Sequence, residues 1–170
     1  MVQGVTPLKI LQVVRPDSFT LLDLPTPMPG PDEVLMRVDA VTTCPQWDLH
    51  LRHNEPMFVG HSFHYPYTPG QPGHEATGEI AAVGTNVTGL KPGDRVSAWI
   101  DPGHHRMGCY AQYVLMSADH VIKVPDDLPP HELAPVELSM CVGTVFRMLA
   151  SMNAIKGSRF GISGLGPAGL

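Results

Sequence analysis

The sequence predicts a mainly β protein with some α structure: a barrel-like body of short strands, then a helix, then the first strand of a different kind of domain. Three observations support this prediction. Short apolar stretches alternate with Gly- and Pro-rich turns from residue 8 to about 124. The apolar residues then change to helical spacing after residue 130. Finally, a short apolar stretch at 159–163 runs into a group of glycines.

The expected strands are short and each ends at a turn signal. The clearest is 34–41, because Val34, Met36, Val38 and Ala40 would share one face of an extended chain. The first two strands flank a Pro-Asp-Ser turn. The strands expected before the helix are 8–14, 19–24, 34–41, 78–84, 95–100, 110–116 and 120–125.

A helix is expected over about 131–154. Its apolar residues recur at three- and four-residue steps, at Val142, Val145, Leu149 and Met152. Pro135 lacks a backbone N–H and would divide the helix into two pieces. We therefore expect a strand-rich domain over 1–130, and a connecting helix with the start of a second domain over 131–170.

The composition is that of an acidic globular protein. Of 170 residues, 43% are hydrophobic and 16% charged, with a net charge of −5. This charge lacks the Lys/Arg excess that nucleic-acid binding needs, and no run approaches the roughly 18 apolar residues of a membrane span. Neither nucleic acid nor membrane is therefore an expected partner. The three cysteines are odd in number and far apart, so a reducing, cytoplasmic location is expected.

Cys44 and His74 suggest a zinc site. They stand 30 positions apart, each at the end of an expected strand, where a barrel can bring them together. A catalytic zinc takes three protein ligands and keeps a fourth position open. Glu75 would be a fourth ligand or a carboxylate behind the ligands, and Cys141 or Glu137 would be the third ligand. A lone cysteine is more often a small buried apolar residue, so spacing alone also allows a site without metal.

The glycines near the end of the chain form a second pattern. Gly164-x-Gly166-x-x-Gly169 follows the apolar stretch 159–163, as in the dinucleotide-binding fingerprint. The pattern alone is weak, because the helix and the acidic residue that confirm it would lie further along the chain. The other interpretation is a glycine-rich, frayed terminus.

Longer motifs give these residues a context. Residues 73–87 follow GHE-x2-G-x5-G-x2-V, and further landmarks are KPGDRV at 91–96, GCYAQY at 108–113 and KVPD at 123–126. In this order they resemble the zinc-dependent alcohol dehydrogenase type of the medium-chain dehydrogenase/reductase superfamily. The resemblance covers nearly the whole chain.

The resemblance implies a GroES-like, partly open β-barrel joined to a Rossmann domain, with Zn²⁺ and NAD or NADP as cofactors. Cys44 and His74 would be zinc ligands, Asp48 would hold His74 or position the metal-bound water, and His50 would be the proton-relay histidine. The substrate would be a small alcohol, aldehyde or ketone. Family members often form dimers or tetramers, so a homo-oligomer stays open.

The sequence departs from the family pattern around the first ligand. The usual Cys-x-x-Asp-x-His is one residue longer here, and Gln46 and Trp47 stand where a Ser or Thr hydroxyl begins the proton relay. Residues 50–72 form an unusually long connection with extra histidines, for which a surface loop is favoured over a substrate-shaping loop.

Two further departures concern the metals. The four cysteines of the structural zinc lobe are missing, so no structural zinc is expected. For the catalytic zinc, Cys141 is slightly preferred to Glu137 as third ligand, because thiolate is the softer ligand.

Two alternatives to the zinc enzyme stay open: a zinc-free reductase of quinone or enoyl type, and a non-catalytic GroES-like binding module. The Cys44/His74 pair argues against the first, and the early stop favours the second. The chain resembles the N-terminal half of a dehydrogenase, and we expect its 170 residues to bind NAD(P) weakly or not at all and to show no turnover.

Overall fold

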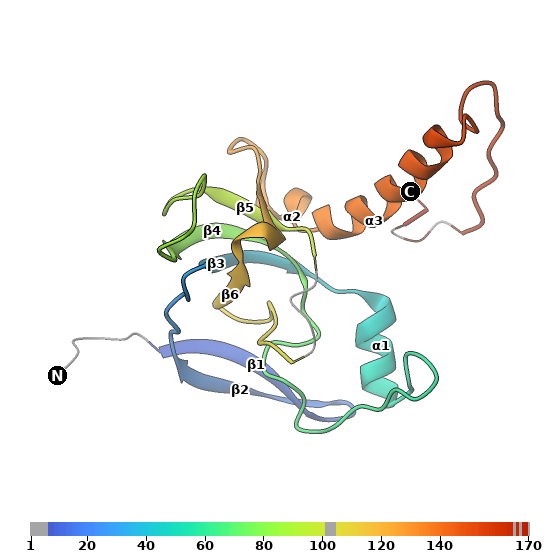
Figure 1. Cartoon of the computed structure of the whole chain (residues 1–170). Helices are drawn as coiled ribbons and strands as arrows, with labels where there is room; N and C mark the ends of the chain where they lie inside the picture. The colour runs from blue at the N-terminus through green and yellow to red at the C-terminus, as the bar shows by residue number, and fades with distance from the viewer. Residues whose placement is uncertain (1–6, 101–104, 165, 167, 170) are drawn as a thin grey trace.

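The computed structural model describes residues 7–100, 105–164, 166, 168 and 169. Figure 1 shows a strand-rich body from which one long helix extends. Its elements are β1 (Pro7–Arg15), β2 (Ser18–Pro25), β3 (Glu33–Thr42), α1 (Pro45–His53), β4 (Glu75–Val83), β5 (Arg95–Ala98), β6 (Tyr113–Ser117), a 3₁₀ turn (Ala118–His120), β7 (Val121–Lys123), α2 (Pro130–Leu133) and α3 (Val136–Ser151).

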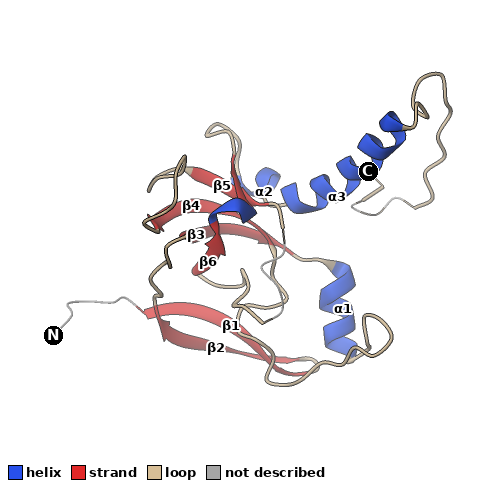
Figure 2. Ribbon diagram, in the orientation of Figure 1, coloured by secondary structure: helices blue, strands red, loops and turns tan. Residues whose placement is uncertain are grey.

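The strands form two antiparallel sheets, of order β6-β3-β4-β5-β7 and β1-β2. Figure 2 shows the two-stranded sheet below the larger one. Backbone bonds join them across the segment before β6, where the N–H of Leu11 donates to Tyr110 O at 2.9 Å and Ile10 bridges Ala111. The result is the partly open barrel that the resemblance predicted, and all seven expected strands of the body are confirmed to within a few residues.

The pairing of β3 with β4 fixes the geometry of the site. The register places Thr42, at the end of β3, opposite Glu75, at the start of β4. The close approach of the two strands depends on Gly78, because a Cβ atom there would lie 1.9 Å from Arg37 O. Segments that leave β3 and enter β4 therefore emerge at the same end of the barrel, and Cys44 and His74 lie in those segments.

A continuous core fills the larger sheet's inner face. The predicted inward residues Val34 and Met36 are fully buried, and Leu35 is nearly so. The fully buried members of this core are Val34, Met36, Ala76, Ile80, Val96, Ala98, Cys109, Val114 and Met116. A core of this extent lets the sheet hold strand ends in fixed positions.

The helical region divides at Pro135, as the sequence predicted. Its first piece is held to the sheet, since Ser97 Oγ donates to Leu133 O at 3.0 Å and both residues are buried. By contrast, much of α3 faces solvent, and its exposed apolar side chains are Met140, Val145, Phe146 and Met148. Only the first part of α3 is thus positioned by the barrel.

One stretch in the described residues meets the length and composition of a membrane-crossing helix. It spans Pro130–Ser151, with a mean hydropathy of 1.4 and 11% of its apolar window buried. A single such helix is weak evidence for a membrane, and the break at Pro135 leaves two shorter pieces. The absence of a membrane partner therefore stays a prediction.

Two segments differ from the sequence-based expectations. Helix α1 was not expected, although its signals are present: Pro45 at its first position, Asp48 in its first turn and Asn54 in the left-handed conformation at its end (φ 56°). The expected strand at 159–163 does not form. A strand forms by pairing its backbone with at least one neighbouring strand, and the described strands all belong to the barrel body.

Candidate metal centre

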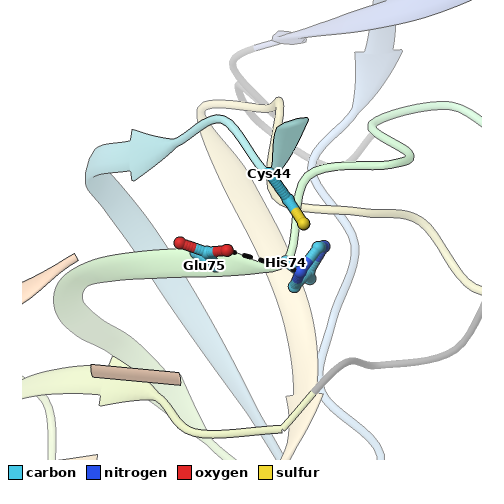
Figure 3. Close-up of side chains that lie close together, drawn as sticks. All are labelled: Cys44, His74 and Glu75. Carbon is cyan, nitrogen blue, oxygen red and sulfur yellow. Dashed lines mark ion pairs between the residues drawn. The ribbon is translucent and has the colours of Figure 1, made fainter. Parts of the chain in front are cut away.

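Three side chains with metal-ligand chemistry meet where β3 ends and β4 begins. The Cys44 sulfur, a His74 ring nitrogen and a Glu75 carboxylate oxygen all lie within 4.8 Å of one another. Figure 3 shows the Cys44 sulfur pointing toward the His74 ring, with Glu75 beside it. The convergence of Cys44 and His74, expected from strand ends alone, is present in the fold.

The ring of His74 is oriented to offer one nitrogen. It is buried, with 6% of its surface exposed. Its Nδ1 lies 2.7 Å from Pro72 O and donates a hydrogen bond to it. In the neutral ring this bond selects the tautomer in which Nε2 offers its lone pair to a metal. Nε2 faces Glu75 Oε1 at 3.7 Å.

Glu75 is likewise held by one oxygen while the other faces the cluster. Thr42 Oγ1 donates to Glu75 Oε2 at 2.6 Å, a contact that follows from their pairing across the ladder. The residue is 4% exposed. A carboxylate kept from water needs hydrogen bonds and opposite charge, and a metal cation beside Oε1 would supply that charge.

Cys44 occupies the N-cap position of α1. Burial raises the pKa of its thiol, the backbone N–H groups of Trp47 and Gln46 lower it, and the carboxylates of Glu75 and Asp48 raise it again. A cation would offset both burial and carboxylates by favouring the thiolate. Sulfur, imidazole nitrogen and carboxylate oxygen are the donors that zinc takes in proteins, so the residues present fit the metal that the resemblance implies.

Asp48 has different partners from those the resemblance implied. Its Oδ2 accepts from the N–H of Cys44 at 2.7 Å, and its Oδ1 accepts from Tyr110 Oη at 3.0 Å. The His74 ring is instead oriented by Pro72 O. The extra residue in this chain's Cys-x-x-x-Asp spacing puts Asp48 one full helical turn after Cys44, where it reaches back to the Cys44 N–H. Burial raises the pKa of Asp48, and the Tyr110 and Cys44 hydrogen bonds oppose that rise.

His50 lies on α1, half exposed. Its Nε2 is 3.4 Å from Gln46 Nε2, and its Nδ1 is 3.2 Å from Glu55 O. Gln46 also lines the cleft beside Cys44. An amide therefore stands between this cleft and His50, at the place where the sequence lacked the relay hydroxyl.

The two candidates for the third ligand are one turn apart on α3. Cys141 Sγ lies 3.6 Å from Glu137 Oε1. Burial raises the pKa of Cys141, as do Glu137 and, from across the cleft, Glu75 and Cys44. Both residues fall outside the three-residue cluster, so α3 brings them near the site without closing it.

An open cleft of about 750 Å³ lies between the cluster and α3. Its walls include Thr42, Cys44 and Glu75 from the barrel and Pro135 and Leu138 from the helical region. Ala168, from the glycine motif, lines it too. The cleft therefore has room for a small substrate beside the cluster.

The glycine motif forms a tight turn at this cleft. Gly164 has a φ of +101°, and the N–H of Gly169 donates to Gly166 O at 2.8 Å. A Cβ on Gly169 would lie 2.2 Å from Gly164 O, so only glycine fits. The strand expected before these glycines is absent, so their role in binding a dinucleotide stays a prediction.

The long connection after α1 packs as the sequence favoured. The rings of Trp47, His61 and Tyr67 each meet the ring of Phe63 in a T-shaped arrangement, with centroids between 4.7 and 6.3 Å apart. His61 Nδ1 accepts from the N–H of Met57, which indicates a packing role. Residues 101–104 lie outside the described residues, so the expectation about a structural zinc stays a prediction.

Comparison with known proteins assigns the fold to a family. The sequence profile of the alcohol dehydrogenase GroES-like domain matches residues 30–126, more than half of the chain. The chain belongs to this family. The resemblance to zinc-type medium-chain dehydrogenases is thereby confirmed, and with it the GroES-like barrel.

Individual relatives of this GroES-like domain protein are dehydrogenases and reductases. An alcohol dehydrogenase of Geobacillus stearothermophilus is 34% identical over 162 residues, which cover 81% of this chain and 45% of that protein. The mitochondrial enoyl-[acyl-carrier-protein] reductase of Homo sapiens is 33% identical over 100 residues, 59% of this chain and 25% of that protein. These relatives place the chain in an oxidoreductase family.

A solved structure shares the fold. CAD from Helicobacter pylori, complexed with NADP(H), superposes with a TM-score of 0.71 at 22% identity, over 96% of this chain and 54% of that one. At this identity the likeness concerns the fold alone. The chain spans about half the length of the curated alcohol dehydrogenases it matches.

Proposed function

We propose that this chain is the metal-holding, catalytic part of a zinc-dependent NAD(P)-linked oxidoreductase that interconverts a small alcohol and its aldehyde or ketone. The observation that carries the proposal is the convergence of Cys44, His74 and Glu75, with His74 Nε2 left free by the Nδ1 bond to Pro72. The family assignment and the dehydrogenase relatives support the reaction class.

Each residue of the site has a distinct task in this proposal. Cys44 and His74 hold the metal, and Thr42 turns Glu75 so that one oxygen faces it. Cys141 or Glu137 completes the site from α3. Zinc, when bound, supplies Lewis-acid polarisation of the substrate oxygen, and a dinucleotide supplies the hydride chemistry. Pro135 and Leu138 give the cleft an apolar wall that would face the carbon side of a substrate.

Proton movement in this protein departs from the family's usual route. The hydroxyl that begins the relay is replaced by the Gln46 amide, which contacts His50. An amide passes a proton poorly, so protons from the cleft would exchange with water through its open side. We propose that His50 contributes little to the reaction compared with Cys44 and His74.

The zinc content of the purified chain and its variants tests the proposal directly. Purified wild type is expected to retain one zinc per chain, whereas Cys44→Ser and His74→Ala retain far less. Comparing Cys141→Ser with Glu137→Ala identifies the third ligand, because the variant that lacks this ligand should lose more zinc. His53→Ala is a matched control, because His53 is exposed at the far end of α1, and it should retain zinc as wild type does.

The outcomes separate the alternatives. Wild type without zinc, after folding in the presence of zinc, would overturn the proposal and favour a zinc-free reductase of quinone or enoyl type. Zinc bound without any turnover, when a complete dinucleotide-binding partner is supplied, would favour a non-catalytic GroES-like module.

A further inference from the structure

Tyr110 stands behind the metal cluster, in the segment that leads into β6. It is partly buried, and its hydroxyl donates to Asp48 Oδ1 at 3.0 Å. Burial raises the pKa of Tyr110, as does the charge of Asp48, so its hydroxyl stays protonated and donates. The proposed reaction assigns this side chain no task.

The ring of Tyr110 lies against the backbone that carries His74. A Cβ atom on Gly73 would come within 2.9 Å of Tyr110 Cγ and within 2.7 Å of Tyr110 N. Backbone bonds hold the two segments together, since the N–H of Cys109 donates to Gly73 O at 2.7 Å and that of Tyr110 to Gly70 O at 3.0 Å. Glycine at position 73 therefore lets the ring rest directly on the residue before His74.

The hydroxyl of the same side chain reaches the other ligand. Asp48 uses one oxygen for Tyr110 and the other for the N–H of Cys44, at 2.7 Å. Tyr110 thus touches the His74 segment with its ring and the Cys44 segment through Asp48. The Cys44 segment follows β3, the His74 segment precedes β4, and Tyr110 lies in a third segment, the one before β6.

We propose that Tyr110 is a positioning residue that holds Cys44 and His74 at metal-binding separation. This inference rests on the metal centre of the proposed function. A ligand pair held in place before the metal arrives loses less conformational freedom on binding, and groups that support metal ligands commonly contribute 10- to 100-fold in affinity.

The hydroxyl, not the ring, makes the difference between positioning and ordinary packing. A phenyl ring at position 110 would fill the same space on Gly73. It would leave Asp48 Oδ1 without its donor in a partly buried place. Asp48 could then turn toward water and release the N–H of Cys44. Packing alone predicts that this change affects stability but not the metal.

The experiment compares Tyr110→Phe with wild type and with Tyr113→Phe, a matched control in the same motif at the start of β6. The dissociation constant for Zn²⁺ is measured by competition with a chromophoric chelator, and circular dichroism verifies the fold. Tyr110→Phe is expected to weaken zinc binding about tenfold, and Tyr113→Phe less than twofold. Equal affinity of wild type and Tyr110→Phe would overturn the proposal.

Two further readouts separate positioning from stability. In a double-mutant cycle, adding Tyr110→Phe to Asp48→Ala should lower the zinc affinity little further, because the link from Tyr110 to Cys44 is already broken. Additive losses of zinc affinity would contradict the proposal. The ligand-field spectrum of bound Co²⁺ should shift in Tyr110→Phe and not in Tyr113→Phe, and an unchanged spectrum would count against it.

The test stays decisive if Tyr110→Phe folds only with metal. The rate of zinc release from the loaded chain into EDTA is then compared, with a tenfold faster release expected and an unchanged rate refuting the role of Tyr110. Wild type that binds no zinc at all would overturn the metal centre itself. Wild type that binds zinc while Tyr110→Phe matches it would overturn only the present inference.

Discussion

Replacing Thr42 by valine tests how the barrel holds the buried carboxylate of Glu75. Valine has nearly the shape of threonine, so the change removes a hydroxyl without opening a cavity. The lost contact is a 2.6 Å hydrogen bond to a carboxylate that is 4% exposed. Hydrogen bonds to charged groups contribute about 1.5–3 kcal/mol, and a buried acceptor left without its donor has few other partners.

The free energy of unfolding of the zinc-free chain should therefore fall by about 2 kcal/mol. For a chain of this size, that loss lowers the melting temperature by about 4–8 °C. The assay is urea unfolding in EDTA, monitored by circular dichroism. If the slope of the unfolding free energy against urea concentration is the same for both proteins, the difference between their midpoints gives the change in stability.

Thr43→Val provides the control, because Thr43 is the next residue and is exposed. It should change stability by less than about 0.5 kcal/mol. Thr42→Ser, which restores a hydroxyl, should recover most of the loss. If Thr42→Val and Thr43→Val unfold at the same urea concentration, the Thr42–Glu75 bond contributes nothing and the reasoning is wrong.

Two other predictions concern pH and the cofactor. The N–H of Gly30, and then Arg106, hold the pKa of Glu33 below its ordinary 4.5, so its stabilising contribution is complete above that pH and is lost as pH falls through the lower, folded value. Glu33→Gln should therefore be less stable than wild type at pH 7 by about 1 kcal/mol, and this difference in stability should disappear below pH 4.5. A stability difference that does not change with pH would contradict the prediction, and so would an equal difference in the exposed control Glu132→Gln. Calorimetric titration with NADH or NADPH should show no binding tighter than millimolar by the 170-residue chain, because 159–163 forms no strand before the glycine turn; micromolar affinity would refute it.

The body of the fold could be predicted from the sequence because its signals are local. Val34 and Met36 alternate as a buried strand requires, and Pro135 lacks the backbone N–H that the interior of a helix needs. The strand ends predicted that Cys44 and His74 lie close together, and the β3/β4 pairing does bring them together; their role as metal ligands stays a prediction. Cys44 is also the N-cap of α1, a short helix that the apolar pattern of the sequence does not predict.

Other features depend on contacts between distant segments. Thr42 bonds the carboxylate of Glu75, 33 residues away, and Tyr110 bonds that of Asp48, 62 residues away. No local sequence pattern predicts partners so far apart in the chain. The strand at 159–163 had the right residues, but strand formation depends on neighbours and not on sequence alone. The third ligand is undecided for a similar reason, since Glu137 and Cys141 share one face of α3.

The placement of α3 has a thermodynamic consequence. In the proposed metal centre, Cys44 and His74 lie on the barrel, while either candidate for the third ligand lies on a helix that contacts the barrel only at its beginning. Binding of the ion would then favour the position of α3 against the barrel, and that position would favour binding of the ion by the same free energy, because the two equilibria are linked. Any molecule that binds α3 and moves it away from the barrel would lower the affinity for the ion. Conversely, the fraction of chains that hold the ion would indicate how often α3 lies against the barrel.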